Sequence, residues 1–141
     1  MREPYVFQDL ERMNTDAERC LIVEDTETDR AMMRRVVTRQ CEGQNFIFAK
    51  SLREAREILK TRAIFFVFLD NTLPDGRGAD FVAELAAHPE WKRLPVVIVS
   101  DWPSPFLYAK AKACNVLEIW TKNDFKGPEI LRVLGAKSRA F

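Results

Sequence analysis

The sequence has little of what would build a disulfide framework or a zinc site. Among 141 residues there are three cysteines, with no CxxC pair, and one histidine, His88. Three dispersed cysteines predict no paired-disulfide scaffold, and one histidine cannot complete a Cys/His zinc site. A large charge of one sign is also missing, because the formal net charge is +1. We therefore expect no direct nucleic-acid partner and no anionic membrane surface.

Long apolar runs are absent too. No stretch approaches the roughly 18 apolar residues that indicate a membrane span, and there is no signal-peptide pattern. We therefore expect a cytoplasmic protein that does not enter a membrane. With 47% hydrophobic residues, the chain has enough apolar side chains for one packed domain.

What the sequence does contain is a set of short apolar runs that end on reactive polar side chains. Runs rich in β-branched and aromatic residues predict strands of a parallel sheet buried on both faces. Because ligand sites of open α/β sheets lie at the carboxyl ends of the strands, we expect these polar groups to meet there. The runs are 20–23 before Glu24 and Asp25, 64–69 before Asp70, 96–99 before Ser100, and 116–120 before Thr121 and Lys122.

Helical patterns alternate with these strands and with a further predicted strand over 45–49. Ser51, with Glu54 three residues later, predicts a helix N-terminus, and Gly127-Pro128 and Gly135 predict the start and the end of the last helix. The order of elements predicts a doubly wound α/β domain, with a five-stranded parallel sheet and helices on both faces. The expected helices begin near 26–28 and cover 51–59, 79–87, 105–113 and 127–135.

The residue types at the predicted strand ends suit phosphoryl chemistry. Asp70 is a candidate nucleophile toward a phosphoryl group, as carboxylates are in aspartyl-phosphate enzymes. Glu24 and Asp25 would repel Asp70 unless a cation lies between them, and such hard oxygen ligands favour Mg²⁺, with Mn²⁺ as the alternative ion. Ser100 can donate a hydrogen bond to a phosphoryl oxygen, and Lys122 can neutralise another.

Together these motifs resemble the receiver domain of two-component response regulators. The resemblance covers about residues 18–136 and rests on LIVED (21–25), LDNTLPDGRG (69–78), PVVIVS (95–100) and TK (121–122). The separations are 45 residues from Asp25 to Asp70, 30 from Asp70 to Ser100 and 22 from Ser100 to Lys122, as is typical of that family. The resemblance implies a flavodoxin-like fold with strand order 2-1-3-4-5, and it implies that the backbone carbonyl of Thr72 completes the protein ligands of the metal.

The resemblance also implies a function, that of a signalling domain with self-phosphorylation and autodephosphorylation chemistry rather than a metabolic enzyme. Asp70 would accept a phosphoryl group from a sensor histidine kinase or a phosphotransfer protein in a Mg²⁺-dependent reaction. Phosphorylation would then switch a downstream-partner surface formed by the fourth helix, the fifth strand and the fifth helix. A homodimer through the C-terminal face is left open.

The domain organisation expected from the sequence is simple. Residues 18–136 form the receiver domain, and 137–141 form a short basic tail. Residues 1–17 form an N-terminal extension, in which the spacing of Val6, Leu10 and Met13 predicts a short amphipathic helix.

The chain departs from the family pattern at three places. The residue after Ser100 is usually small, but here Asp101 and Trp102 follow, and we expect them to restrict access to the site and to slow phosphorylation or hydrolysis. Lys122 precedes Asn123 where the family usually has proline, so we expect a trans peptide bond there. The usual aromatic switch position holds Ile119, and strand alternation predicts that Trp120 faces the opposite side.

Two other functions are considered. A pseudo-receiver would keep the fold and bind partners without turning over phosphate, and Asp101, Trp102 and Asn123 keep this alternative open. A phosphatase of the haloacid-dehalogenase type is suggested by Asp70-Asn71-Thr72-Leu73, but its nucleophile would fall at Phe68, which has no nucleophilic atom.

Overall fold

The computed structural model describes residues 19–139. The main strands are β1 (Arg19–Val23), β2 (Asn45–Ala49), β3 (Ile64–Asp70), β6 (Val96–Val99) and β7 (Val116–Trp120). The helices are α2 (Glu27–Gln40), α3 (Leu52–Thr61), α4 (Gly78–Ala87), α5 (Pro105–Lys112) and α6 (Gly127–Arg139), with a short 3₁₀ turn, η1 (Lys122–Asp124). A two-stranded hairpin, β4 (Thr72–Leu73) and β5 (Gly76–Arg77), follows β3. Within this part of the chain no helix is long and apolar enough to cross a membrane.

The five main strands form one parallel sheet in the order β2-β1-β3-β6-β7. When the small hairpin is set aside, this is the order 2-1-3-4-5, so the expected doubly wound α/β fold is confirmed. β1 and β3 are inner strands, and their carboxyl ends lie side by side because Val23 pairs with Leu69.

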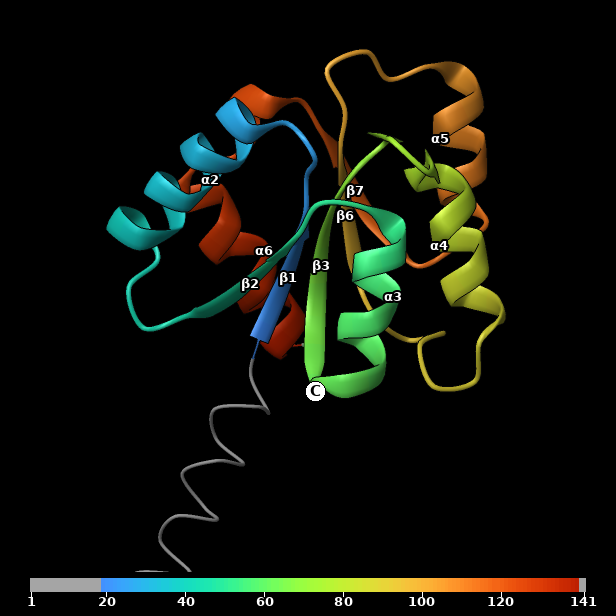
Figure 1. Cartoon of the computed structure of the whole chain (residues 1–141), viewed down its shortest axis with the longest axis horizontal. Coiled ribbons are helices and arrows are strands. Elements are labelled where there is room, and N and C mark those ends of the chain that lie inside the picture. The colour runs from blue at the N-terminus through green and yellow to red at the C-terminus, as the bar shows by residue number, and fades with distance from the viewer. Residues whose placement is uncertain (1–18, 140–141) are drawn as a thin grey trace, which may run out of the picture.

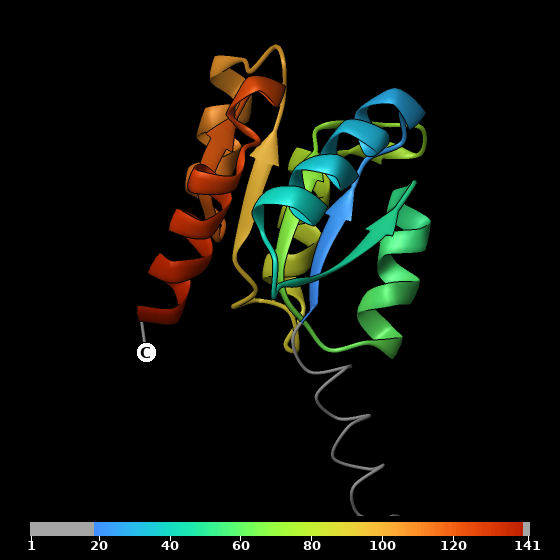
Figure 2. The ribbon, with the colours of Figure 1, turned by 90° about the vertical axis from the view of Figure 1, so that its left-hand side faces the viewer.

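Helices cover both faces of the sheet, as Figures 1 and 2 show. Residues of α3, α4 and α5 pack with Leu21, Leu69 and Ile98 in one buried cluster. Residues of α2 and α6 pack with Ile22, Phe68 and other side chains of the opposite face in a second cluster. Alternate residues of each inner strand therefore point to opposite apolar layers, which is why these strands are continuous apolar runs in the sequence.

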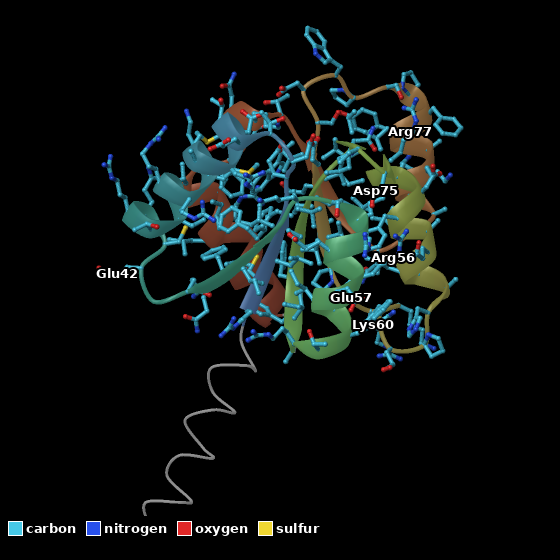
Figure 3. The ribbon with its side chains drawn as sticks, in the orientation of Figure 1. Glu42, Arg56, Glu57, Lys60, Asp75 and Arg77 are labelled. Atoms are coloured by element: carbon cyan, nitrogen blue, oxygen red, sulfur yellow. The ribbon has the colours of Figure 1, made fainter. Side chains whose placement is uncertain are left out.

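Helix α3 begins where the sequence predicts it, and hydrogen bonds between residues close in the sequence cap its N-terminus. Ser51 is the N-cap, and its side chain accepts a hydrogen bond of 3.1 Å from the N–H of Glu54, while Glu54 Oε1 accepts one of 2.8 Å from the N–H of Lys50. Asp75, from the β4–β5 hairpin, accepts from the N–H groups of Leu52 and Arg53, each at 2.9 Å. Figure 3 shows Asp75 beside the N-terminal end of α3, so this carboxylate ties the hairpin after β3 to the next layer.

The structure differs from the sequence-based prediction in two local features. The segment 71–78, for which the sequence predicts no strand, contains the β4–β5 hairpin. Gly135 was predicted to end the last helix, but α6 continues to Arg139. An interior glycine costs about 1 kcal/mol relative to alanine, which weakens a helix without ending it when the following residues still favour helix. The predicted amphipathic helix in 1–17 lies outside the described residues, and the boundaries of the receiver domain at 18 and 136 stay a prediction.

Candidate functional site

The register of the sheet brings the predicted site residues to one edge. Val23 pairs with Leu69, so Glu24 follows β1 next to Asp70 at the end of β3. Asp70 pairs with Val99, and Val99 pairs with Trp120, which places Ser100 and the segment from Thr121 onward just beyond the same edge. Parallel pairing alone therefore gathers side chains that are up to about a hundred residues apart in the sequence.

Three carboxylates form the centre of the site. One oxygen from each of Glu24, Asp25 and Asp70 lies within 4.8 Å of the other two. Glu24 is fully buried, whereas Asp25 is exposed and Asp70 is half-buried. One oxygen of Glu24, Oε2, accepts a hydrogen bond of 3.1 Å from the N–H of Thr26 at the start of α2. The backbone carbonyls of Glu24 and Asp25 both accept hydrogen bonds from Arg30, which holds this turn in place.

The other oxygen of Glu24, Oε1, has no hydrogen-bond partner although it is buried. Lys122 Nζ lies 3.0 Å away, so the two groups form an ion pair. A buried anionic oxygen without a hydrogen bond is costly unless a charged partner or a metal ion supplies the contact. This oxygen, together with the three clustered carboxylates, fits a hard divalent cation.

The environment of Asp70 disfavours its charged form. Burial, followed by the nearby charge of Glu24, raises the pKa of Asp70 to about 7, although the hydrogen bond from the Thr72 N–H and the charge of Lys122 oppose this shift. The Thr72 N–H donates to Asp70 Oδ1 over 3.3 Å, so the residue predicted to offer its carbonyl to a metal also orients the Asp70 carboxylate. Asp70 is thus a carboxyl group with a pKa of about 7, and its acidic neighbour Glu24 directly follows β1.

The backbone around Asp70 is closely packed against the start of α4. The N–H of Gly78 donates to the carbonyl of Asn71 over 2.8 Å, and Asn71 Oδ1 accepts from the N–H of Ala79 over 3.0 Å. A Cβ atom on Gly78 would lie 2.7 Å from the carbonyl oxygen of Asp70, so a larger residue cannot occupy this position without displacing the backbone. The glycine is required by this close approach.

Lys122 is the cation of the site. Its Nζ atom lies 2.6 Å from Asp29 Oδ2 and 3.0 Å from Glu24 Oε1, and its side chain is 16% exposed. Burial alone would lower the pKa of Lys122, but the contacts with Asp29 and Glu24 outweigh burial and raise the pKa above its ordinary value. The ammonium therefore stays charged and acts on Asp70 as a nearby positive charge.

Ser100 is buried at the end of β6, and its backbone N–H donates to the carbonyl of Trp120 over 2.7 Å. This bond continues the β6–β7 ladder one residue beyond the strand and fixes Ser100 beside the carboxyl end of β3. Asp75 and Asp80 lie outside the carboxylate cluster: Asp75 caps α3, and Asp80 pairs with Lys110 of α5. Phe68, the position that a dehalogenase-type phosphatase would need as nucleophile, is fully buried in the core.

The segments that depart from the family pattern have definite roles here. Asp101 Oδ1 accepts a hydrogen bond of 3.1 Å from the backbone N–H of Lys122. The side chain of Trp102 is directed to solvent, since the residue is 90% exposed, and it covers little of the neighbouring surface. No cis peptide bond occurs within 19–139, so the bond from Lys122 to Asn123 is trans as expected, and η1 begins there with a capping box between Thr121 and Asp124.

Ile119 and Trp120 face opposite sides of the sheet, as strand alternation predicts. Ile119 packs on the cluster covered by α3, α4 and α5, whereas Trp120 belongs to the cluster covered by α2 and α6. The Trp120 ring lies 5.5 Å from that of Phe68, and its indole N–H donates to Glu118 Oε1 over 2.7 Å. Trp120 is therefore a core residue and cannot take the place of an aromatic at 119.

Sequence reasoning missed Asp29 as a member of the site. Asp29 lies in the first turn of α2, and nothing in the sequence indicates that its carboxylate meets a lysine 93 residues away. The only local signal is its place in the acidic segment that follows β1, and such residues are also common simply because negative charge is favourable at helix N-termini.

A doubly wound parallel sheet with an acidic cluster, a serine and a lysine at its carboxyl edge defines the class of α/β receiver domains. The sequence matches the family model described as the response regulator receiver domain over residues 20–133, and the chain belongs to that family. A search of curated proteins found no match.

Solved structures show the same fold. The Mn²⁺-bound form of response regulator Rcp1 is 21% identical, with a TM-score of 0.72, over 84% of this chain and 94% of that one. The phosphorylated cyanobacterial phytochrome response regulator RcpA is 20% identical, with a TM-score of 0.72, over 83% and 94%. A CheY-like receiver domain protein from Methanospirillum hungatei JF-1 is 16% identical, with a TM-score of 0.75, over 89% and 99%. At these identities the likeness concerns the fold.

Proposed function

We propose that this receiver domain accepts a phosphoryl group on Asp70 from the phosphohistidine of a sensor histidine kinase or of a phosphotransfer protein. The observation that carries the proposal is the cluster of Glu24, Asp25 and Asp70, whose oxygens approach within 4.8 Å while Lys122 contacts Glu24. Three carboxylates held this close favour a divalent cation, and the lysine favours an anionic group. The family match supports both expectations.

The residues have separate tasks in the reaction. Asp70 Oδ attacks phosphorus, an O–P bond forms, the N–P bond of the phosphohistidine breaks, and the electron pair of that bond returns to the imidazole nitrogen. Ser100 donates a hydrogen bond to one phosphoryl oxygen, and the Lys122 ammonium neutralises another, both in the transition state and in the product. Attack of water on the phosphoryl group then breaks the O–P bond, releases inorganic phosphate and returns Asp70 to its free carboxylate.

Glu24, Asp25, Asp70 and the backbone carbonyl of Thr72 would hold Mg²⁺, with Mn²⁺ as the alternative ion. When bound, the ion supplies positive charge that neutralises the phosphoryl oxygens. The structural observation that favours ligation is a buried carboxylate oxygen, Glu24 Oε1, that accepts no hydrogen bond and has the Lys122 ammonium 3.0 Å away. Rcp1 was solved with Mn²⁺ and RcpA in a phosphorylated form, which supports the same chemistry in this fold.

The partner surface proposed for the output is the one formed by α5, β7 and α6. Among the described residues, the large apolar side chains that are exposed all fall between the loop before α5 and α6. They are Trp102 (90% exposed), Phe106 (70%), Tyr108 (50%), Leu117 (45%) and Leu131 (43%). Exposed apolar side chains on these elements favour a role in protein binding.

Intact-mass analysis after incubation with acetyl phosphate or phosphoramidate tests the proposal. We expect a Mg²⁺-dependent gain of one phosphoryl group, about 80 Da, which Asp70→Asn abolishes and Asp75→Asn does not. If the wild-type protein gains no phosphoryl group under conditions in which it binds Mg²⁺, the pseudo-receiver alternative replaces the proposal.

A further inference from the structure

Lys122 is held by a carboxylate that belongs neither to the metal cluster nor to the acceptor. Asp29 Oδ2 lies 2.6 Å from Lys122 Nζ in hydrogen-bond geometry, whereas the Glu24 contact is longer, at 3.0 Å, and is not a hydrogen bond. The two partners come from different elements, because Asp29 is in the first turn of α2 and Lys122 follows β7. The shortest contact of the site's lysine is therefore with Asp29.

We propose that Asp29 is a positioning residue that holds the Lys122 ammonium on the α2 side of the site, in competition with the phosphoryl group. This inference rests on the proposed function, because it assumes that Lys122 contacts a phosphoryl group on Asp70. Breaking the Asp29 contact would free Lys122 for that group and make phosphorylation faster.

The surroundings of Asp29 make it an effective competitor. A hydrogen bond between an ammonium and a carboxylate is stronger than a bond between neutral groups. The position in the first turn of α2 also favours a negative charge, because the N-terminus of a helix carries a partial positive charge. Both side chains are only partly exposed, 16% for Lys122 and 32% for Asp29, so water screens the pair less than it would at the surface.

Asp29 is not one of the proposed metal ligands and can be changed without removing any of them. The cluster in which each carboxylate offers an oxygen within 4.8 Å of the others contains Glu24, Asp25 and Asp70. Asp29 contacts this cluster through Lys122, so a change at Asp29 leaves the proposed metal ligands in place. Asp70 influences Lys122 through charge, whereas Asp29 holds it through a hydrogen bond of 2.6 Å.

Competition predicts the direction of the effect. A lysine ammonium has three N–H donors, and moving it toward the phosphoryl group requires that the donor held by Asp29 be released. Partly exposed ion pairs contribute up to about 1 kcal/mol, which corresponds to about a two- to fivefold change in rate. Asp29→Asn keeps the size of the side chain and removes its charge, so we expect phosphorylation by acetyl phosphate to become about two- to fivefold faster.

The experiment measures the rate of Mg²⁺-dependent phosphorylation by intact mass for the wild type, Asp29→Asn, Asp29→Glu and Glu27→Gln. Glu27 is an exposed acid in the same first turn of α2, so Glu27→Gln controls for loss of charge at the helix N-terminus. Asp29→Glu keeps the charge and should keep a slow rate. The pair Lys122→Gln and Lys122→Gln/Asp29→Asn then shows whether Asp29 acts through the lysine.

A second measurement does not depend on phosphorylation. The ¹H–¹⁵N NMR signal of the Lys122 ammonium reports how fast its hydrogens exchange with water, and a strong contact with Asp29 slows this exchange. We expect faster exchange in Asp29→Asn than in the wild type or in Glu27→Gln. A merely structural role of Asp29 would leave this signal unchanged.

The outcomes separate the inference from the function on which it rests. Three results together support the inference: faster phosphorylation of Asp29→Asn, no added effect of that change in the Lys122→Gln background, and faster exchange of the Lys122 ammonium in Asp29→Asn. If the Lys122→Gln proteins react too slowly to measure, the ammonium exchange rate decides. Phosphorylation of the wild type with an unchanged or slower Asp29→Asn rate overturns the inference alone, as does an equal acceleration without Lys122. If neither the wild type nor Asp29→Asn is phosphorylated, the proposed function fails, and this inference with it.

Discussion

Asp101 and Lys122 are joined by a hydrogen bond of 3.1 Å from the backbone N–H of Lys122 to Asp101 Oδ1. The bond links the loop after β6 to the loop after β7, and these two loops carry Ser100 and Lys122. A residue that is unusual for the family thus supports the segment that holds the lysine, in a chain that lacks the usual proline after it.

Asp101→Ala removes this bond, and we expect it to lower the free energy of unfolding by about 1 kcal/mol, the typical net contribution of one hydrogen bond. Asp101→Asn keeps an acceptor oxygen and should retain most of the stability. Urea unfolding followed by circular dichroism measures both. Equal losses for the two variants would show that charge, and not the hydrogen bond, is responsible.

Trp102→Ala should leave the rate of phosphorylation unchanged. The sequence suggests that this bulky residue blocks the site, but the residue is 90% exposed and its ring has little surface in contact with the protein. The measurement is the initial rate of labelling by acetyl phosphate beside the wild type. A several-fold acceleration would instead support occlusion by the indole ring.

Asp70→Asn should stabilise the metal-free protein, and more so at higher pH. An aspartate in the unfolded chain titrates near pH 4, whereas the folded pKa of Asp70 is about 7. Between these two pH values Asp70 carries a proton in the folded state but not in the unfolded state. The wild-type protein therefore loses stability as pH rises from 4 to 7. One pKa unit corresponds to about 1.4 kcal/mol, which solvent screening reduces for a half-buried group, so we expect a gain of about 1–2 kcal/mol above pH 7.

Thermal unfolding in a chelator at pH 5, 6, 7 and 8 measures this difference, with Glu42→Gln as a control at an exposed acid away from the site. The gap in melting temperature between Asp70→Asn and the wild type should widen up to about pH 7 and then stay constant. A gap that is the same at every pH would contradict the raised pKa.

Mg²⁺ binding should weaken as pH falls below about 7, where Asp70 takes up a proton. A metal ligand must be deprotonated, so binding releases a proton and the affinity falls toward tenfold per pH unit. Titration calorimetry at several pH values, in two buffers with different ionisation enthalpies, measures both the affinity and the proton release. Affinity that does not change between pH 5.5 and 7.5 would exclude Asp70 as the ligand that titrates.

Asp75→Ala should destabilise α3 and the hairpin after Asp70. The carboxylate accepts from the N–H groups of Leu52 and Arg53, and losing a helix cap costs about 0.5–2 kcal/mol. Burial alone would raise the pKa of Asp75, but these two hydrogen bonds outweigh burial and lower it. The stabilisation is therefore present above the unfolded pKa and is lost as pH falls through the folded value.

Chemical unfolding of Asp75→Ala at neutral and at acidic pH checks this expectation. The difference from the wild type should be largest at neutral pH and should shrink in acid, where both proteins lack the charged cap. Asp75→Asn, which keeps an acceptor oxygen, should fall between them.

Much of the fold follows from local patterns. The bounds of β2, β6 and β7 were predicted to the residue, because each strand is a short run rich in β-branched or aromatic residues. The start of α3 was predicted from Ser51 and Glu54, whose capping contacts lie within four residues. The extension of α6 past Gly135 was missed, since the cost of an interior glycine, about 1 kcal/mol, can be offset by neighbouring structure. The β4–β5 hairpin was missed because strands of two residues are too short to show an alternating pattern.

The sequence by itself determined which chemical groups follow the buried strands: Glu24 and Asp25, Asp70, Ser100 and Lys122. Apolar periodicity is local, and parallel strands have one carboxyl edge, so their meeting there could be expected. Only the tertiary structure decided how these groups contact one another. The pairing of Lys122 with Asp29 and the bond from its backbone to Asp101 depend on side-chain directions in loops packed against other elements, and no local pattern encodes a contact across 93 residues.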